Sequence, residues 1–119
     1  MMLDWKEYKG QIAAAVREMA ALNPDVVRAY AGLHHANAKA KHLDPKTREL
    51  IALAAAITLK CDGCIDAHSE GALRAGASKE EIVEVIGVTV SVNAGAAMVF
   101  SARAIDAYDT YATKTETKT

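Results

Sequence analysis

Apolar residues recur at intervals of three and four along the first third of the chain, which is the period of an amphipathic helix. The first stripe consists of Trp5, Tyr8, Ile12, Val16 and Met19. It predicts a helix that ends near Ala21. Asn23 and Pro24 then indicate a second helix, because asparagine is a common N-cap and proline is favoured at the first helical position. The stripe of this second helix consists of Val26, Tyr30, Leu33 and Ala36.

The pair Asp44-Pro45 repeats this start signal and predicts a third helix. We expect this helix to end near Ile57 or Thr58. The residues expected to face inward are Leu50, Ile51, Leu53, Ala54 and Ile57.

Two further helix starts follow. A fourth helix is expected to begin near Cys61 or Asp62 and to stop at Gly76, because glycine readily takes the left-handed conformation that ends a helix. Ser78 and Glu81 have the spacing of a capping box, which predicts the start of a fifth helix.

Residues 88–93 alternate between apolar and polar side chains and are rich in β-branched residues, as a strand would be. We nevertheless predict a helix, because both flanks are helical and a lone strand could not pair its backbone groups. A break is expected near residues 93–95, before a last helix that continues through Tyr108 or Tyr111.

This pattern predicts an all-α fold: a single compact bundle of five to six helices in residues 1–112, followed by a disordered polar tail at 113–119. A length of 119 residues fits one domain. The segment from Ile82 to Phe100 is apolar nearly all round, and a small bundle rarely buries such a helix alone. We therefore expect a homo-oligomer.

Composition and charge narrow the classes of partner. Fourteen basic and fifteen acidic residues give a net charge of -1, which argues against a nucleic-acid partner. The charged first residues do not resemble a secretory signal. The charge-free run from Val85 to Ala102 is slightly shorter than a membrane span of about 20 residues. We expect a soluble, cytoplasmic protein without membrane contact.

The candidate chemistry lies in Cys61, Cys64 and His68. On a helix these positions share one face, because each residue turns about 100°. Cysteine reacts as its thiolate, which a helix N-terminus, a cation or a base stabilises. Cys61 would be the N-cap and Cys64 would lie in the first turn, with His68 one turn further as a base. Asp62 and Asp66 are expected to point away, toward solvent.

Several chemistries remain open for this pair. It could cycle between dithiol and disulfide, either as a peroxidase or as a general disulfide oxidoreductase. It could also bind structural zinc together with His68 and a fourth ligand from His42, Glu49 or another subunit. Buried thiols in a non-catalytic oligomeric module are the third possibility. The helical placement favours redox chemistry without a metal.

Glu49 precedes this motif, and the pattern Glu-x11-Cys-x2-Cys-x3-His resembles the alkylhydroperoxidase D-like group of the carboxymuconolactone decarboxylase superfamily. The matching stretch runs from about Asp44 to Ala107. The resemblance implies an all-helical fold, commonly assembled into a ring-shaped hexamer or trimer, and a cofactor-free peroxidase activity toward hydroperoxides. It also implies that Cys64 is the peroxidatic cysteine and Cys61 the resolving one, with His68 and Glu49 as a proton relay.

We expect the reductant of such a site to be a protein or lipoyl-type dithiol. The superfamily's decarboxylase activity is not expected, because members that have it typically lack the cysteine pair. One residue departs from the pattern: Gly63 stands where the family often has an aromatic residue or histidine, which leaves the thiols without that cover.

The predicted relay sets a structural condition. If the third helix ends near Ile57 and turns at Leu59-Lys60, Glu49 lies about 12 Å back from the turn and His68 about 10 Å down the next helix. The two side chains would then be level. The alternative is that Glu49 lies on a solvated face, paired with Arg48 or Lys46.

Overall fold

The computed structural model of the chain describes residues 2–116, and this part contains six helices and no strand. They are α1 (Trp5–Leu22), α2 (Pro24–Ala38), α3 (Pro45–Leu59), α4 (Asp62–Arg74), α5 (Lys79–Phe100) and α6 (Ala102–Glu116). The predicted all-helical class is confirmed, including a helix rather than a strand over residues 88–93.

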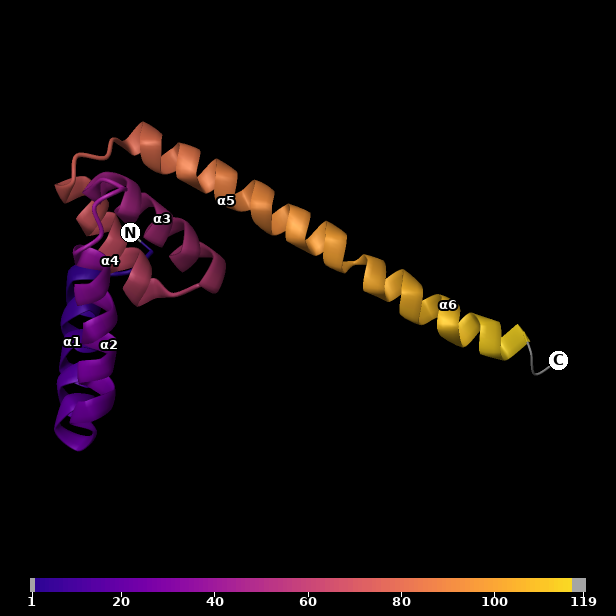
Figure 1. Cartoon of the computed structure of the whole chain (residues 1–119), viewed down its shortest axis with the longest axis horizontal. Coiled ribbons are helices and arrows are strands. Elements are labelled where there is room, and N and C mark those ends of the chain that lie inside the picture. Colours follow the sequence, from indigo (N-terminus) through magenta and orange to yellow (C-terminus); the bar gives the residue numbers. More distant parts are fainter. Residues whose placement is uncertain (1, 117–119) are drawn as a thin grey trace.

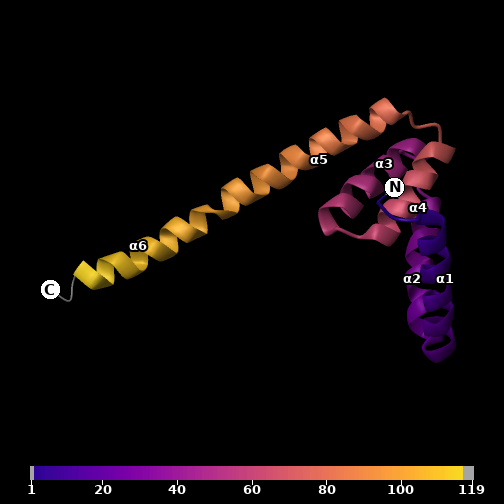
Figure 2. The ribbon, with the colours of Figure 1, turned by 180° about the vertical axis from the view of Figure 1, so that it is seen from behind.

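Figure 1 and Figure 2 show three parts: a hairpin of α1 and α2, a hub of α3 and α4, and a long arm of α5 and α6 that leaves the hub. The start of α1 lies at the hub, and α6 forms the far end of the arm.

Side-chain caps fix four of the helix starts, those of α1, α3, α4 and α5. Asp4 accepts a hydrogen bond from the Glu7 N–H at 3.1 Å, and Asp44 accepts one from the Thr47 N–H at 2.7 Å. These caps satisfy N–H groups that have no partner inside the helix. Asn23 precedes α2 as predicted, but its side chain makes no capping bond. Its own N–H instead donates to the Met19 carbonyl and closes α1.

The break in the last apolar segment lies further along the chain than predicted. α5 continues through residues 93–95 to Phe100, and the interruption falls at Ser101. Asn93 lies within the helix, and its amide donates to the Thr89 carbonyl one turn earlier, at 2.8 Å. At Ser101 the hydroxyl donates to the Ala97 carbonyl, a bond that often bends helices.

The last helix is longer than predicted. α6 passes Tyr111 and continues to Glu116, so residues 113–116 are helical rather than disordered. The Thr113 hydroxyl donates to the Asp109 carbonyl at 2.8 Å, which ties this turn to the preceding one. The rest of the predicted tail, residues 117–119, lies outside the described residues.

The buried core is small and lies in the hub. Its apolar members in the described part are Leu53, Ala56, Ala72 and Ala77. Leu53 faces inward as predicted, whereas the prediction for Ile51 is wrong because this side chain is 54% exposed. Ala56 lies on the buried face instead. Alanine and glycine at the facing positions allow α3 and α4 to pack closely.

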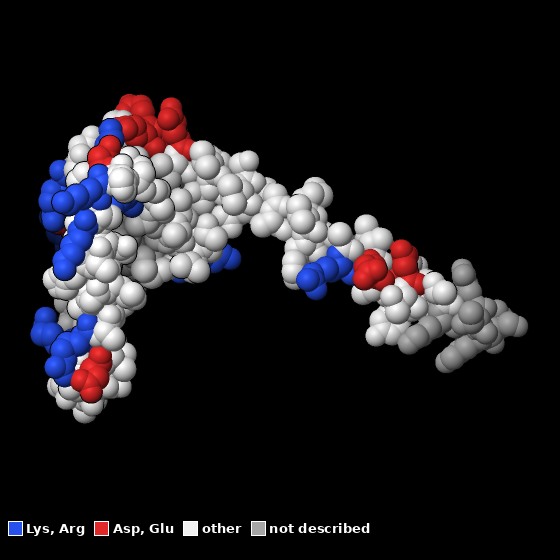
Figure 3. Space-filling model, in the orientation of Figure 1, with Lys and Arg blue, Asp and Glu red and all other residues white. Residues whose placement is uncertain are grey.

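The arm leaves its apolar residues uncovered. The chain extends over 65 × 41 × 35 Å, so the single chain does not form the compact bundle that was predicted. Val88 and Val92 are each 65% exposed. Figure 3 shows a stretch of α5 between the hub and α6 with almost no charged side chains. Large uncovered apolar surfaces of this kind mark interaction sites.

The stretch Lys79–Thr113 is long and apolar enough to cross a membrane, by length and composition alone. This is weak evidence for a membrane span, because the core helix of a soluble protein meets the same criteria.

Two polar contacts hold α5 to the hub. Lys46, in the first turn of α3, forms an ion pair of 2.8 Å with Glu81 in the first turn of α5. Glu81 also completes the predicted capping box with Ser78. Further along, Asn93 donates to the Thr58 hydroxyl at 2.9 Å. The ion pair with Lys46 and the hydrogen bond from Ser78 hold the pKa of the Glu81 carboxyl below its ordinary value of 4.5.

Replacing Glu81 by glutamine tests this contact. A carboxyl whose pKa is lowered on folding stabilises the fold above pH 4.5 and loses that effect as the pH falls through its folded pKa. We expect Glu81→Gln to lower the melting temperature by about 3 °C at pH 7, and the difference from the native chain to vanish near pH 3. Thermal unfolding followed by circular dichroism across this range measures it.

The matched control is Glu80→Gln, which removes the same charge from the same helical turn. Glu80 is exposed and none of the described ion pairs involves it. An equal loss of stability in both variants would contradict a specific role for the Lys46–Glu81 pair.

Candidate functional site

The site begins at the turn between α3 and α4. The Lys60 N–H donates to the Ile57 carbonyl and the Cys61 N–H donates to the Ala56 carbonyl, both at 3.1 Å. These two bonds form a Schellman motif, with Lys60 in the left-handed conformation at φ 56° and ψ 46°. α3 therefore ends at Leu59, slightly later than predicted, and the reversal occupies Lys60 and Cys61.

The same motif ends α4, where the Gly76 N–H donates to the Leu73 carbonyl and the Ala77 N–H donates to the Ala72 carbonyl. Gly76 has a φ of 94° there, as the sequence predicts. Lys60 takes a position that usually belongs to glycine. A lysine gives no such signal, and for that reason the sequence placed the end of α3 too early.

Cys61 and Cys64 lie at the start of α4 as predicted. Cys61 is the N-cap, and its Sγ accepts a hydrogen bond from the Cys64 N–H at 3.3 Å. The two residues form a disulfide, with their Cα atoms 5.3 Å apart. This separation lies in the range for which two cysteines can bond without moving the backbone. The CxxC pair is therefore arranged for a reversible disulfide at the positive end of a helix dipole.

The structure brings Glu49 and His68 together. Glu49 Oε2 lies 2.8 Å from His68 Nδ1, between the antiparallel helices α3 and α4. The side chains are 32% and 26% exposed, so water reaches the pair but does not surround it. A carboxylate on Nδ1 fixes the orientation of the imidazole and leaves Nε2 as the free nitrogen. Cys64 lies one turn before His68 on the same helix.

The alternative partners of Glu49 are engaged elsewhere. Arg48 donates to the Asn37 carbonyl at 2.7 Å and to the Ala40 carbonyl at 3.2 Å, where it closes the end of α2. Lys46 pairs with Glu81. Glu49 is thus not paired with either cation, and its observed partner is His68.

One side chain beside the site differs from its predicted environment. Asp66 does not face solvent: its side chain is 12% exposed and pairs with Lys9 of α1 at 2.8 Å. Lys9 also pairs with Glu70 at 2.8 Å, so a single ammonium group bridges two carboxylates of α4. These contacts raise the pKa of Lys9 above its ordinary value. Nothing in the sequence signals a pair between residues so distant in the chain.

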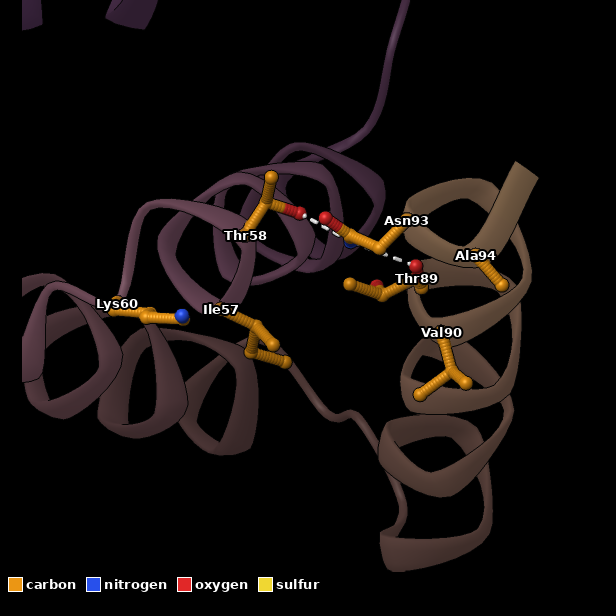
Figure 4. Close-up of a pocket in the computed structure, with 7 residues that line it drawn as sticks. All are labelled: Ile57, Thr58, Lys60, Thr89, Val90, Asn93 and Ala94. Carbon is orange, nitrogen blue, oxygen red and sulfur yellow. Dashed lines mark hydrogen bonds between the residues drawn. The ribbon is translucent and has the colours of Figure 1, made fainter. Parts of the chain in front are cut away.

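The surroundings of the cysteines are open. A side chain at Gly63 would meet no other atom within 4 Å. No described residue of another helix therefore fills the place of the aromatic residue or histidine that the family often has at this position. A groove of about 470 Å³ lies nearby, where α5 crosses the end of α3. Figure 4 shows its seven lining residues, with Lys60 and Ile57 on one side and Val90 and Ala94 on the other.

No group of three or more potential metal ligands occurs among the residues that the structure describes. His42, one of the suggested fourth zinc ligands, lies in the exposed segment between α2 and α3. Sulfurs that are bonded to each other are not available as thiolate ligands. The arrangement of Cys61, Cys64, His68 and Glu49 thus suits thiol chemistry with a nearby base.

Comparisons with known proteins agree with this fold. Residues 24–107 match the sequence model of the carboxymuconolactone decarboxylase family. An uncharacterised protein of Haemophilus influenzae is 44% identical over 108 residues, which cover 91% of this chain and 96% of that protein.

Two solved structures are similar. One is a carboxymuconolactone decarboxylase family protein from Legionella pneumophila, with a TM-score of 0.70, 30% identity, and coverage of 88% of this chain and 94% of that one. The other is a protein from Methanobacterium thermoautotrophicum, with a TM-score of 0.66, 27% identity, and coverage of 71% and 96%.

The turn that positions the cysteines generates a prediction about stability. A left-handed conformation costs a residue with a side chain about 1 kcal/mol relative to glycine. We expect Lys60→Gly to raise the free energy of unfolding by up to about 1 kcal/mol, partly offset by the greater freedom of glycine in the unfolded chain. Urea unfolding at fixed protein concentration measures the change.

Gly76→Ala is the matched reverse substitution at the other Schellman motif, and we expect it to lower the free energy of unfolding by about 1 kcal/mol. A decrease caused by Lys60→Gly would show that the Lys60 side chain stabilises the turn by more than its conformation costs.

Proposed function

The chain belongs to the carboxymuconolactone decarboxylase family, and from its site we propose that it is a thiol-dependent hydroperoxide reductase of the alkylhydroperoxidase D-like type. One observation carries the proposal: the Cys61–Cys64 disulfide caps the helix on which His68 is held by Glu49. The family includes more than one activity. The cysteine pair and the adjacent base favour the peroxidase.

In the first step the Cys64 thiolate attacks the terminal oxygen of the hydroperoxide. The O–O bond breaks, an S–O bond forms, and the alkoxide leaves with a proton as the alcohol. The sulfur is oxidised to a sulfenic acid, and the peroxide is reduced. Cys64 lies in the first turn of α4, where the helix dipole favours the thiolate.

In the second step the Cys61 thiol attacks the sulfenic sulfur of Cys64. The new S–S bond releases the hydroxyl group with one proton as water. The disulfide present in the structure corresponds to this state. A protein or lipoyl-type dithiol then exchanges with the disulfide, which restores both thiols and leaves the reductant oxidised.

Glu49 and His68 provide the proton path. The Glu49 carboxylate accepts a hydrogen bond from the His68 Nδ1–H. The Nε2 lone pair of His68 is then available for the proton of the Cys64 thiol. The same nitrogen can return that proton to the leaving alkoxide. General acid–base catalysis of this kind contributes about 10² to 10⁴ in rate.

Peroxide consumption tests the proposal directly. We expect the native chain to consume an alkyl hydroperoxide continuously when a dithiol is supplied, and Cys64→Ser to show only the rate of the dithiol alone. Without the dithiol, which would itself reduce a sulfenic acid, Cys61→Ser should consume about one equivalent and keep the sulfenic acid on Cys64, because no resolving thiol is present. A dimedone adduct on Cys64, detected by mass spectrometry, identifies that trapped state.

Equal rates for the native chain and Cys64→Ser would contradict the peroxidase. Reduction of protein disulfides by the native chain without peroxide turnover would instead favour the general disulfide oxidoreductase. Bound zinc near one per chain, with thiols that resist a stoichiometric dose of peroxide, would favour the structural role.

We further propose that the chain acts in the cytoplasm as a ring-shaped homo-oligomer, a trimer or hexamer, in which copies of α5 cover one another. The uncovered apolar residues of the arm support this, together with a buried core of only a few residues in each chain. Burying such a helix between subunits releases its apolar surface from water, the main driving force of association.

A charge within the arm tests the assembly. We expect the native chain of 12.6 kDa to elute at a multiple of that mass, and Val92→Glu to dissociate it toward the monomer, because an unpaired carboxylate is costly in an apolar interface. Size-exclusion chromatography with light scattering measures the masses. Lys39→Glu, in the turn after α2, is the control and should keep the native mass. A native chain that is monomeric at all concentrations would contradict the assembly.

A further inference from the structure

Gly71 lies one turn after His68 on α4, directly against the carboxylate of Glu49. A methyl group on its Cα would lie 2.6 Å from Glu49 Cδ, 2.6 Å from Oε2 and 2.8 Å from Oε1. Non-bonded carbon and oxygen atoms do not approach this closely. The space that holds the Glu49 carboxylate therefore exists only because residue 71 has no side chain.

The other helical glycines of the described part have no such neighbour. Gly10, Gly32, Gly63, Gly87 and Gly95 have no atom within 4 Å of the position that a side chain would take. Glycine is a poorer helix former than alanine, so Gly71 costs α4 some stability. Among the helical glycines of the described part, it is the one whose missing side chain makes room for another side chain, the carboxylate that contacts His68.

We propose that Gly71 is a positioning residue of the candidate site: its missing side chain forms the slot that keeps Glu49 Oε2 on His68 Nδ1. The inference deepens the proposed peroxidase and rests on it for the effect on turnover. The contact itself does not depend on the reaction. Within the sequence, the signal is a helical glycine three residues after the histidine of the motif.

The geometry predicts that Gly71→Ala displaces the Glu49 carboxylate without destabilising the fold. Glu49 is partly exposed, and the atoms that meet the added methyl group are the far end of a flexible side chain. The carboxylate can swing into water, whereas α4 gains a better helix former. We therefore expect Gly71→Ala to fold as the native chain does, while the Glu49–His68 hydrogen bond is lost.

Four chains test the inference: the native one, Gly71→Ala, Glu49→Asp, and the double variant. We expect Gly71→Ala to lower dithiol-dependent hydroperoxide turnover about tenfold, a fraction of a full acid–base contribution. Glu49→Asp alone also lowers turnover, but its shorter side chain withdraws the carboxylate from the position of the methyl group. In that background Gly71→Ala should cost nothing further. Gly10→Ala, a helical glycine in open space, is the matched control and should keep the native rate.

A second measurement is independent of turnover. In the native chain the His68 Nδ1–H should give a downfield proton resonance typical of a bond to a carboxylate, and Gly71→Ala should abolish it. If the native chain shows no peroxidase activity but this resonance behaves as expected, the proposed function fails and the positioning role stands.

Three results would overturn the inference. One is a Gly71→Ala chain with the native resonance and rate. Another is a double variant whose loss equals the product of the two single losses, because independent effects multiply. In the third, neither Gly71→Ala nor the double variant with Glu49→Asp folds. The added methyl group would then clash with a residue other than Glu49. Folding of the double variant alone would support the contact.

Discussion

The reversal of the chain at Lys60 and Cys61 is the constraint on which the rest of the site depends. Two backbone hydrogen bonds and one left-handed residue end α3 and start α4 within the span of a single turn. This places the cysteine pair at a helix N-terminus and sets α4 antiparallel to α3. Glu49 lies about 15 Å back along α3 from Leu59 and His68 about 9 Å along α4 from Asp62, and the two side chains reach across this offset to contact each other. A longer connector would separate them.

Interactions between residues close in sequence made the helix starts and the shared face of the site predictable. Proline after Asn23 and Asp44, and the Ser78–Glu81 capping box, mark helix starts through interactions within four residues of each other. The shared face of Cys61, Cys64 and His68 follows from the helical period alone. The meeting of Glu49 with His68 required one further assumption, a tight antiparallel turn, and the structure satisfies it within about one residue.

The remaining features depend on contacts between distant segments. Asp66 was expected in solvent because its partner Lys9 lies on α1, and no periodicity predicts that α1 packs on α4. Ile51 is exposed although its position in the apolar pattern is inward, because no helix of the described part covers that side of α3. The interruption falls at Ser101 instead of near Asn93, and Asn93 is held by a bond to Thr58 of α3, a contact between distant segments that the local pattern does not reveal.

The contacts that hold α5 fix its rotation about its own axis as well as its position. The Lys46–Glu81 pair and the Asn93–Thr58 hydrogen bond lie about three turns apart along α5 and about 120° apart around its axis, and both hold the helix against α3. The rotation of α5 about its axis is thereby fixed, and this determines which valines of the helix face outward. Thr58 lies two residues before Lys60, at the end of α3 that leads into the cysteine pair. The same end of α3 therefore also fixes the direction in which the apolar arm extends. The end of α3 therefore holds both the cysteine pair and the helix that carries the apolar outer surface.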